Sequence, residues 1–302
     1  MTRFELGINT CFAVKRWPLA RSWAELVRRE LDLGLVQHSL DLVDLGTGAR
    51  SRQAQADEVR IACTELGIRL HSTFTGLVAY SSNLLLHPDG KARRRAEAWF
   101  GRAIEFSARA GALSTGGHVG ALSVLDAEDA GRARTLRRGM NASVQRLAAL
   151  ARTAGLDHLL IENLAPAREP STFEWVESIL SAGSADRVPV RLCLDVGHLC
   201  TPGTAGAERD PYEWLRRFGS RASTIHLQQS DAAADHHWPF TPEANAAGRI
   251  QASKVLDALE ESGAEEVALI LEVIPAFEAD DRQVLSDLRI SVDYWREALA
   301  GR

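Results

Sequence analysis

The sequence predicts an α/β protein in which eight parallel strands alternate with helices and close into one barrel. Two observations support this. The same join recurs seven times along the 302 residues: an amphipathic helix ends at a glycine, and a short apolar run follows at once. In addition, polar side chains stand near the ends of most of these runs. The first observation indicates parallel βαβ units, and the second favours closure into a barrel.

The first strand is expected over residues 4–9, and each later strand follows a join. Glycine suits the left-handed position just past a helix, where a Cβ atom would clash. The runs after the glycines are mainly apolar, as buried parallel strands are. The joining glycines are Gly34, Gly67, Gly111, Gly155, Gly183, Gly219 and Gly263, and the runs are LVQHSL, IRLHSTF, ALSTGGH, LDHLLIE, RVPVRLCLD, SRASTIHL and AEEVALILE.

Polar residues near the ends of the strands distinguish a barrel from an open sheet. In an open doubly wound sheet, only the strands at the switch point build a site. In a (β/α)₈ TIM barrel, every strand ends at the same mouth. Seven of the eight runs carry such a residue, which favours the barrel: Asn9, His71, His118, Glu162, Asp195, His226 and Glu272.

The overall composition limits the domain organisation and the class of partner. We find no linker and no change of composition, so we expect a single domain over residues 1–302. Segments 75–92 and 228–248 both follow strands, so we expect them on the active face. The net charge of −5 argues against nucleic-acid binding. No apolar run is long enough to span a membrane, and the first residues lack the pattern of a signal peptide.

The cysteines indicate a reduced compartment, and the cytoplasm is the expected location. They form no CxxC pair and show no disulfide-framework spacing. We therefore expect core positions rather than ligand positions for all four: Cys11, Cys63, Cys193 and Cys200.

Four successive strands end in residues that could bind a metal: Glu162 in LLIEN, Asp195 in LCLDVGH, His226 in TIHLQQ and Glu272 in LILEV. A carboxylate at the end of an apolar run is costly unless it is paired or bound to a metal. One such glutamate alone is more often part of a structural salt bridge than a metal ligand. Three carboxylates that converge would repel one another, and one divalent cation would remove that conflict. The oxygen-rich set suits Mn²⁺ first, then Mg²⁺ or Co²⁺, and leaves Zn²⁺ open.

The strand ends IEN, LDVGH, IHL and LEV, in this order, resemble those of the xylose isomerase-like barrels. These proteins include sugar-phosphate isomerases and ketose 3-epimerases. The resemblance covers essentially the whole chain and is strongest after Glu162. It implies that the four strand-end residues bind one metal ion and that His198 contacts substrate oxygens. A loop-capping role for His198 is the alternative. It also implies a small sugar or sugar phosphate as substrate, and a homo-oligomer, because related barrels often form one.

Motifs near the C-terminus narrow this resemblance to one branch of the family. IHLQQSD, HHWPFTPE and EVIPAFEADD with SVDYWREAL resemble the tetrulose-phosphate branch, of the D-erythrulose 1-phosphate 3-epimerase type. Ketose 3-epimerases usually carry Glu and then Arg in the loop after the metal histidine. This chain has Gln228, Gln229, Ser230 and Asp231 there, which makes an unphosphorylated hexulose a poorer expectation.

The implied chemistry moves a proton next to a carbonyl group. The resemblance gives Glu162 and Glu272 the roles of acid and base, with the metal as a Lewis acid for the enediolate. Phosphate donors are expected in the loops: Lys15 and Arg16 in FAVKRW, and Gln228, His236 and His237 after the seventh strand. Lys15 and Arg16 could instead form a solvated pair, and the two loop histidines could belong to a lid.

Two further histidines are expected at the mouth, because they stand near the ends of their runs. His71 and His118 are each predicted either to contact the substrate or to be hydrogen-bonded structural residues.

Other functions remain open within the same fold. An aldose–ketose isomerase or a metal-dependent decarboxylase of a 3-oxo sugar acid would use the same metal set. An endonuclease-IV-like repair enzyme would need more histidines and a basic groove. A non-catalytic barrel would tolerate the loss of a ligand, yet all four are present. We therefore expect a tetrulose-phosphate 3-epimerase.

Overall fold

The fold is described from a computed structural model that covers residues 2–181, 186–200 and 205–302. Eight parallel strands close into a barrel in sequence order, and β1 pairs with both β2 and β8. This confirms the predicted TIM barrel. The strands are β1 (Arg3–Asn9), β2 (Leu35–Ser39), β3 (Arg69–Phe74), β4 (Ser114–Gly117), β5 (His158–Glu162), β6 (Val190–Asp195), β7 (Ala222–Leu227) and β8 (Glu266–Leu271).

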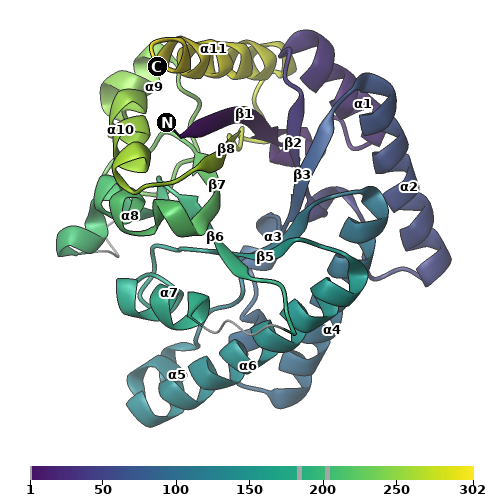
Figure 1. The fold of residues 1–302 in the computed structure, drawn as a ribbon, viewed down its shortest axis with the longest axis vertical. Coiled ribbons are helices and arrows are strands. Elements are labelled where there is room, and N and C mark those ends of the chain that lie inside the picture. The colour runs from purple at the N-terminus through teal and green to yellow at the C-terminus, as the bar shows by residue number, and fades with distance from the viewer. Residues whose placement is uncertain (1, 182–185, 201–204) are drawn as a thin grey trace.

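Helices surround the ring of strands, and the C-terminal helix α11 completes the outer ring near α1 (Figure 1). The outer ring consists of α1 (Ala20–Glu25), α2 (Ala49–Leu66), α4 (Gly90–Ala110), α6 (Ala130–Ala154), α7 (Phe173–Leu180), α8 (Pro211–Phe218), α10 (Ala252–Glu261) and α11 (Asp281–Ala300). Three short helices lie in the loops that follow strands: α3 (Leu77–Tyr80), α5 (Val124–Glu128) and α9 (Pro242–Ala247). The segments 75–92 and 228–248, which were predicted as loops, are therefore partly helical.

Four of the seven joining glycines adopt the expected left-handed conformation. Gly67, Gly111, Gly155 and Gly263 have φ angles of 64°, 83°, 85° and 76°. Gly34 and Gly219 do not, so the prediction is wrong at these two joins, and Gly183 lies outside the described residues. Before β2, the helix ends in a π-turn over Leu26–Glu30 and Asp32 takes the left-handed position with φ 50°. Gly219 has φ −53° and opens a 3₁₀ turn after α8.

Side chains fill the barrel in layers. One buried cluster joins Leu35, Ala268 and Ile270, and another joins Phe74, Leu160 and Cys193. β4 contributes no side chain to these two clusters. Its glycines also let it approach β5 closely. A Cβ atom on Gly116 would lie 1.9 Å from the carbonyl oxygen of Leu160. The barrel is therefore packed through its middle, and space for a ligand remains at its ends.

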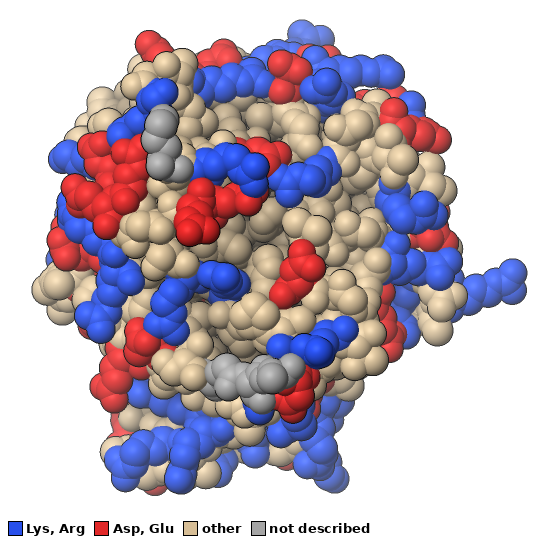
Figure 2. Space-filling model, viewed as in Figure 1, with Lys and Arg blue, Asp and Glu red and all other residues tan. Residues whose placement is uncertain are grey.

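Three of the four cysteines are buried and free, as predicted: Cys11, Cys63 and Cys193. The side chain of Cys200 lies outside the described part of the structure. None of the described helices has the length and apolar character needed to cross a membrane. Lysine, arginine, aspartate and glutamate are interspersed over the face seen in Figure 2, without one continuous basic surface.

Candidate active site

The four predicted ligands converge at the carboxyl end of the barrel. Glu162 ends β5, Asp195 ends β6, His226 is the penultimate residue of β7 and Glu272 directly follows β8. Each offers one ligand atom, and these atoms all lie within 4.8 Å of one another. All four residues are buried. The barrel thus brings together groups that are far apart in the sequence, from Glu162 to Glu272.

Several polar atoms of this cluster lack hydrogen-bond partners among the described residues. They are Glu162 Oε1, His226 Nδ1 and Glu272 Oε2. His226 Nδ1 lies 2.9 Å from Glu272 Oε2 and 3.4 Å from Glu162 Oε1. Buried polar atoms are rarely left without partners. A divalent cation among these three atoms would satisfy all of them, so the residues fit the predicted metal ion.

Gln37 orients the imidazole of this cluster. His226 Nε2 donates to Gln37 Oε1 at 2.6 Å, and this oxygen also accepts from Asn9 Nδ2 at 2.8 Å. The other end of the same amide donates to Ser72 Oγ at 3.0 Å. His226 therefore turns Nδ1 toward the carboxylates, as a metal-bound histidine does when its second nitrogen is held. Gln37 was not among the predicted site residues, although a glutamine inside the apolar run LVQHSL is a visible signal.

The turn after β6 fixes Asp195. Its Oδ1 accepts hydrogen bonds from the backbone N–H groups of Gly197 and His198, at 2.7 and 3.0 Å. Asn163 ties the end of β5 to β6, because its side chain bonds both the N–H and the carbonyl oxygen of Asp195. A side chain at Gly197 would meet Gln228, since a Cβ there would lie 2.2 Å from Cδ of that glutamine. These contacts explain why glycine stands two residues after Asp195 in the motif DVGH.

The two glutamates differ in their electrostatic surroundings. Burial raises the pKa of Glu162, although His226 and His198 oppose this effect. Burial also acts to raise the pKa of Glu272, but the charge of His226, whose Nδ1 lies 2.9 Å from Glu272 Oε2, outweighs it and lowers that pKa. Neighbouring carboxyl groups with pKa values shifted in opposite directions can serve as an acid and a base.

Tyr80 contacts this cluster from α3, and no motif in the sequence indicated it. Its hydroxyl group donates to Glu162 Oε2. Asp41 holds the first turn of α3, because its carboxylate accepts from the backbone N–H groups of Leu77 and Val78, at 2.5 and 3.3 Å. A residue from the loop after β3 is thereby fixed against a residue at the end of β5.

A cavity of about 320 Å³ opens beside the cluster. Its lining includes Glu272, Tyr80, Asp235, His236 and His237, together with Asn9 from β1. No lysine or arginine is among its lining residues in the described chain. The loop after β7 therefore supplies two histidines to the lining of this cavity.

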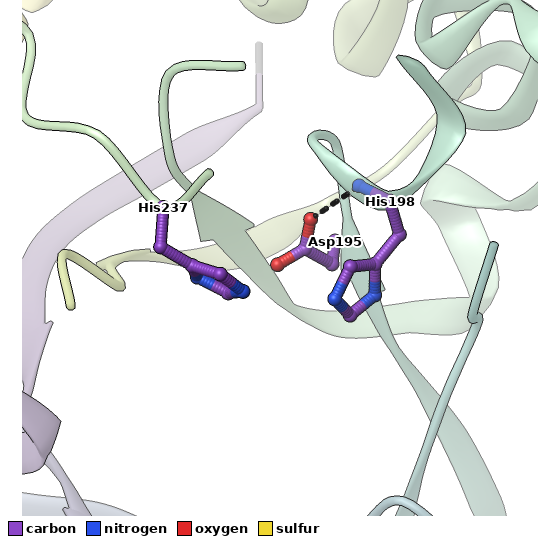
Figure 3. A group of neighbouring side chains, drawn as sticks. All are labelled: Asp195, His198 and His237. Carbon is purple, nitrogen blue, oxygen red and sulfur yellow. Dashed lines mark hydrogen bonds between the residues drawn. The ribbon is translucent and has the colours of Figure 1, made fainter. Parts of the chain in front are cut away.

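A second group of side chains lies beside the first, and Figure 3 shows the rings of His198 and His237 on either side of Asp195. His198 Nδ1 contacts the carbonyl oxygen of Asn163 at 2.9 Å, and His237 Nδ1 contacts that of Glu272 at 3.1 Å. Both Nε2 atoms approach Asp235 Oδ2, at 3.1 and 3.2 Å. Burial would lower the pKa of His237, but Asp235 outweighs it and raises the pKa to about 9.

The other predicted residues of this loop have distinct surroundings. Gln228 Nε2 donates to Asp235 at 2.7 Å, and Gln228 Oε1 accepts from the N–H of His237 at 2.7 Å, so Gln228 holds the loop in place. His236 stacks on Trp238 with 3.8 Å between ring centroids, and its Nε2 lies 3.0 Å from Asp231. His236 lines the cavity.

The two basic residues predicted as phosphate donors, Lys15 and Arg16, are not part of the cavity lining. Lys15 Nζ lies over the ring of Phe277, 4.1 Å from its centroid. Arg16 forms an ion pair with Asp281 at 2.9 Å and donates to the carbonyl oxygens of Ala276 and Ala279. These contacts tie the loop after β1 to the loop after β8. Neither side chain lines the cavity at which phosphate donors were expected: Lys15 is exposed, and Arg16 is held by its protein partners.

His118 lies behind the cavity rather than in its lining. Its ring stacks on Tyr80 with 5.0 Å between centroids, and burial lowers its pKa to about 4. His71 was expected at the mouth, and that expectation is wrong. It is the third residue of β3, which continues to Phe74, so it lies toward the opposite end of the barrel. There it lines a different cavity with His158, and burial lowers its pKa to about 4.

Known proteins resemble this chain in sequence and in fold. The family model of the xylose isomerase-like TIM barrel matches residues 29–293. A D-erythrulose 1-phosphate 3-epimerase of Brucella abortus (strain 2308) is 27% identical over 296 residues, which cover 96% of this chain and 94% of that protein. A crystal structure from Rhodospirillum rubrum, described only provisionally as a xylose isomerase, is 30% identical with a TM-score of 0.90, covering 97% of this chain and 99% of its own.

More distant structures share the fold alone. D-psicose 3-epimerase from Clostridium cellulolyticum H10, solved with D-tagatose, is 17% identical with a TM-score of 0.68. The match covers 98% of this chain and 99% of that one.

Proposed function

The chain belongs to the xylose isomerase-like TIM barrel family, and we propose that it is a divalent-metal-dependent 3-epimerase of a tetrulose phosphate. One observation carries this proposal: two buried glutamates, Glu162 and Glu272, share a ligand cluster beside a small cavity that Glu272 lines. The relative of known activity, a 3-epimerase of a tetrulose phosphate, supports the choice of substrate.

The metal ion would be held by Glu162, Asp195, His226 and Glu272. Three carboxylates and one imidazole favour Mn²⁺, with Mg²⁺, Co²⁺ and Zn²⁺ as alternatives. When bound, the ion supplies Lewis-acid stabilisation for negative charge that develops on substrate oxygens. The three atoms without hydrogen-bond partners support this assignment.

The two glutamates would exchange the proton at C3. One carboxylate removes the proton next to the carbonyl group, which leaves an enediolate, and the other returns a proton to the opposite face. A 1-phosphotetrulose has one stereocentre, C3, so the product is its epimer.

The substrate contacts we propose come from the loops after β6 and β7. His236 and His237 line the cavity, and His198 is held beside them. Gln228 would act through His237, whose backbone N–H it binds. Lys15 and Arg16 would act on the loop after β8, since that is where their contacts lie.

The first experiment uses metal-stripped protein reloaded with Mn²⁺ in D₂O, with D-erythrulose 1-phosphate as the probe and NMR at C3 as the readout. We expect metal-dependent deuterium uptake at C3 with inversion. Stoichiometric metal binding without exchange would exclude this substrate. Release of carbon dioxide from a 3-oxo sugar acid would then favour the decarboxylase, and formation of an aldose would favour the isomerase.

Matched variants connect the reaction to the site. Glu162→Gln and Glu272→Gln should each lower the rate of inversion by roughly 10²- to 10⁴-fold, the usual contribution of an acid or base. Glu58→Gln, at an exposed position on α2, is the control and should leave the rate unchanged. Full activity in either site variant would contradict the assigned roles.

A further inference from the structure

In each of the two glutamates of the cluster, one carboxylate oxygen is hydrogen-bonded within the described chain and the other is not. Glu162 Oε2 accepts from the hydroxyl of Tyr80, and Glu272 Oε1 accepts from Asn9 Nδ2 at 2.9 Å. The remaining oxygens, Glu162 Oε1 and Glu272 Oε2, have no hydrogen-bond partner among the described residues and lie nearest to His226 Nδ1. Each carboxylate thus has one oxygen held by a neutral donor and one turned into the ligand cluster.

Both donors border the cavity, since Asn9 and Tyr80 are part of its lining. Glu272 lines the cavity as well, whereas Glu162 is fully buried and is linked to the lining through the hydroxyl of Tyr80. A carboxylate oxygen has two acceptor positions, so one hydrogen bond leaves room for a proton. Within each carboxylate, the neutral donor and the ligand cluster thus engage different oxygens.

The position of Tyr80 is fixed from three directions. Asp41 holds the backbone of α3 at Leu77 and Val78. Gly76, directly before α3, has no room for a side chain, because a Cβ there would lie 2.1 Å from Asp41 Cγ. The ring stacks nearly parallel on His118, with an angle of 15° between the planes. The hydroxyl group is therefore held in place without help from Glu162.

We propose that Tyr80 is a positioning residue for proton transfer. Its hydroxyl keeps Glu162 Oε2 directed toward the substrate and leaves Oε1 for the cation, and Asn9 does the same for Glu272. Without the hydroxyl, the Glu162 carboxylate can rotate and turn both oxygens into the cluster. The inference rests on the proposed function, because it assigns a task to the proton-transferring glutamate. It adds residues from β1 and α3, which lie outside the four ligand strands.

Tyr80→Phe tests this most sharply, because it retains the ring that stacks on His118 and removes only the hydroxyl. Inversion requires both glutamates in either direction, so it should fall for both epimers by about 10- to 100-fold, the usual effect of an outer-shell partner. Deuterium uptake without inversion needs only one glutamate. The rate of deuterium uptake should stay near that of the unaltered protein for the epimer whose C3 proton faces Glu272. It should fall for the other epimer, whose C3 proton faces Glu162.

Two further measurements separate this role from a structural one. Calorimetric titration with Mn²⁺ should give an affinity no weaker than that of the unaltered protein, because the rotated carboxylate still presents an oxygen to the cluster. Tyr294→Phe is the matched control: it removes a phenolic hydroxyl whose partner is the N–H of Ala252, and it should change neither inversion nor uptake.

The possible outcomes are distinct. Unchanged inversion in Tyr80→Phe, or uptake and inversion that fall in equal proportion for both epimers, would overturn this inference alone. Absence of C3 exchange in the unaltered, Mn²⁺-loaded protein would overturn the proposed function and this inference with it.

Discussion

Gln37 on β2 accepts a hydrogen bond from His226 on β7, with 2.6 Å between Oε1 and Nε2. The bond spans the interior of the barrel, since these strands are not neighbours in the sheet. Because Asn9 also donates to Gln37 Oε1 and the Gln37 amide donates to Ser72, the amide cannot reverse without losing three bonds. The tautomer and direction of the histidine ring are thus set from the opposite side of the barrel.

Replacement of Gln37 should therefore weaken metal binding. In Gln37→Leu, His226 Nε2 loses its acceptor and Nδ1 is no longer held toward the carboxylates. We expect the Mn²⁺ affinity to fall by about 10- to 100-fold, as for other outer-shell partners of metal-bound histidines. Calorimetric titration measures this. Gln53→Leu, at an exposed position on α2, is the control, and equal affinities in the two variants would refute the role of Gln37.

Metal removal should destabilise the protein. An ion that binds the folded cluster and not the unfolded chain would add about 2.7 kcal/mol to the free energy of unfolding at a metal concentration of 100 times Kd. We expect chelation to lower the melting temperature and Mn²⁺ to restore it. Asp195→Asn removes one charged ligand and should reduce this shift. A melting temperature that does not depend on metal would count against a metal ion at this cluster.

Two glycine-to-alanine variants should have opposite effects on stability. Gly116→Ala places a Cβ 1.9 Å from the Leu160 carbonyl oxygen, at a φ of 155°, so β4 must move away from β5. We expect a loss of about 3 kcal/mol or more, in the range of strained backbone and overpacked sites. Gly139 lies exposed within α6 with no atom near its Cβ position. Gly139→Ala should therefore stabilise the protein by about 0.5–1 kcal/mol.

Urea unfolding of both variants at one pH measures these differences. The two changes are chemically identical, so they compare the surroundings alone. A stable Gly116→Ala protein with an unchanged midpoint would contradict the close approach of β4 to β5.

His38 should make the protein sensitive to acid. It is buried between the rings of Trp23 and Phe106, and burial lowers its pKa from 6.5 to about 3. The unfolded chain binds a proton below about pH 6.5, whereas the folded chain does not do so until about pH 3. The stability that depends on the neutral ring is therefore complete above pH 6.5 and is lost as the pH falls. This amounts to about 2 kcal/mol between pH 6.5 and pH 5.

His38→Leu removes this titration, so the free energy of unfolding should fall less steeply with decreasing pH. Urea unfolding at about pH 7.5 and about pH 5 gives the two slopes. The other buried histidines contribute to both proteins, and the difference between the slopes isolates His38. Parallel slopes would show that the folded protein protonates His38 at an ordinary pKa.

The sequence predicted the candidate metal-binding cluster because the carboxyl ends of parallel strands all lie at one end of a barrel. Glu162, Asp195, His226 and Glu272 needed only this rule and their positions at the ends of apolar runs. The same rule failed at His71, because the rule depends on knowing where a strand ends. β3 runs on through Ser72, Thr73 and Phe74, and that extension moves His71 to the other end of the barrel.

Residues that act through other side chains were not predictable. Tyr80, Gln37 and Asp235 belong to different loops and strands, and each has its partner 7 to 189 positions away in the sequence. Lys15 and Arg16 show the reverse case: their charges indicated a phosphate site, whereas the fold gives them partners at Phe277 and Asp281. Residue type alone does not show which of several polar groups a charged side chain will meet.

The sequence by itself determined the alternation of strands and helices, the closure of the barrel and the four residues that end successive strands. Those features depend on local periodicity, on glycine after helices and on one geometric rule for parallel strands. Only the tertiary structure decided which oxygen of each glutamate is hydrogen-bonded, which nitrogen of His226 faces the cluster and which basic side chains lie away from the cavity. Hydrogen bonds between distant strands and loops fix these choices, and such bonds depend on distances that exist only once the barrel has closed.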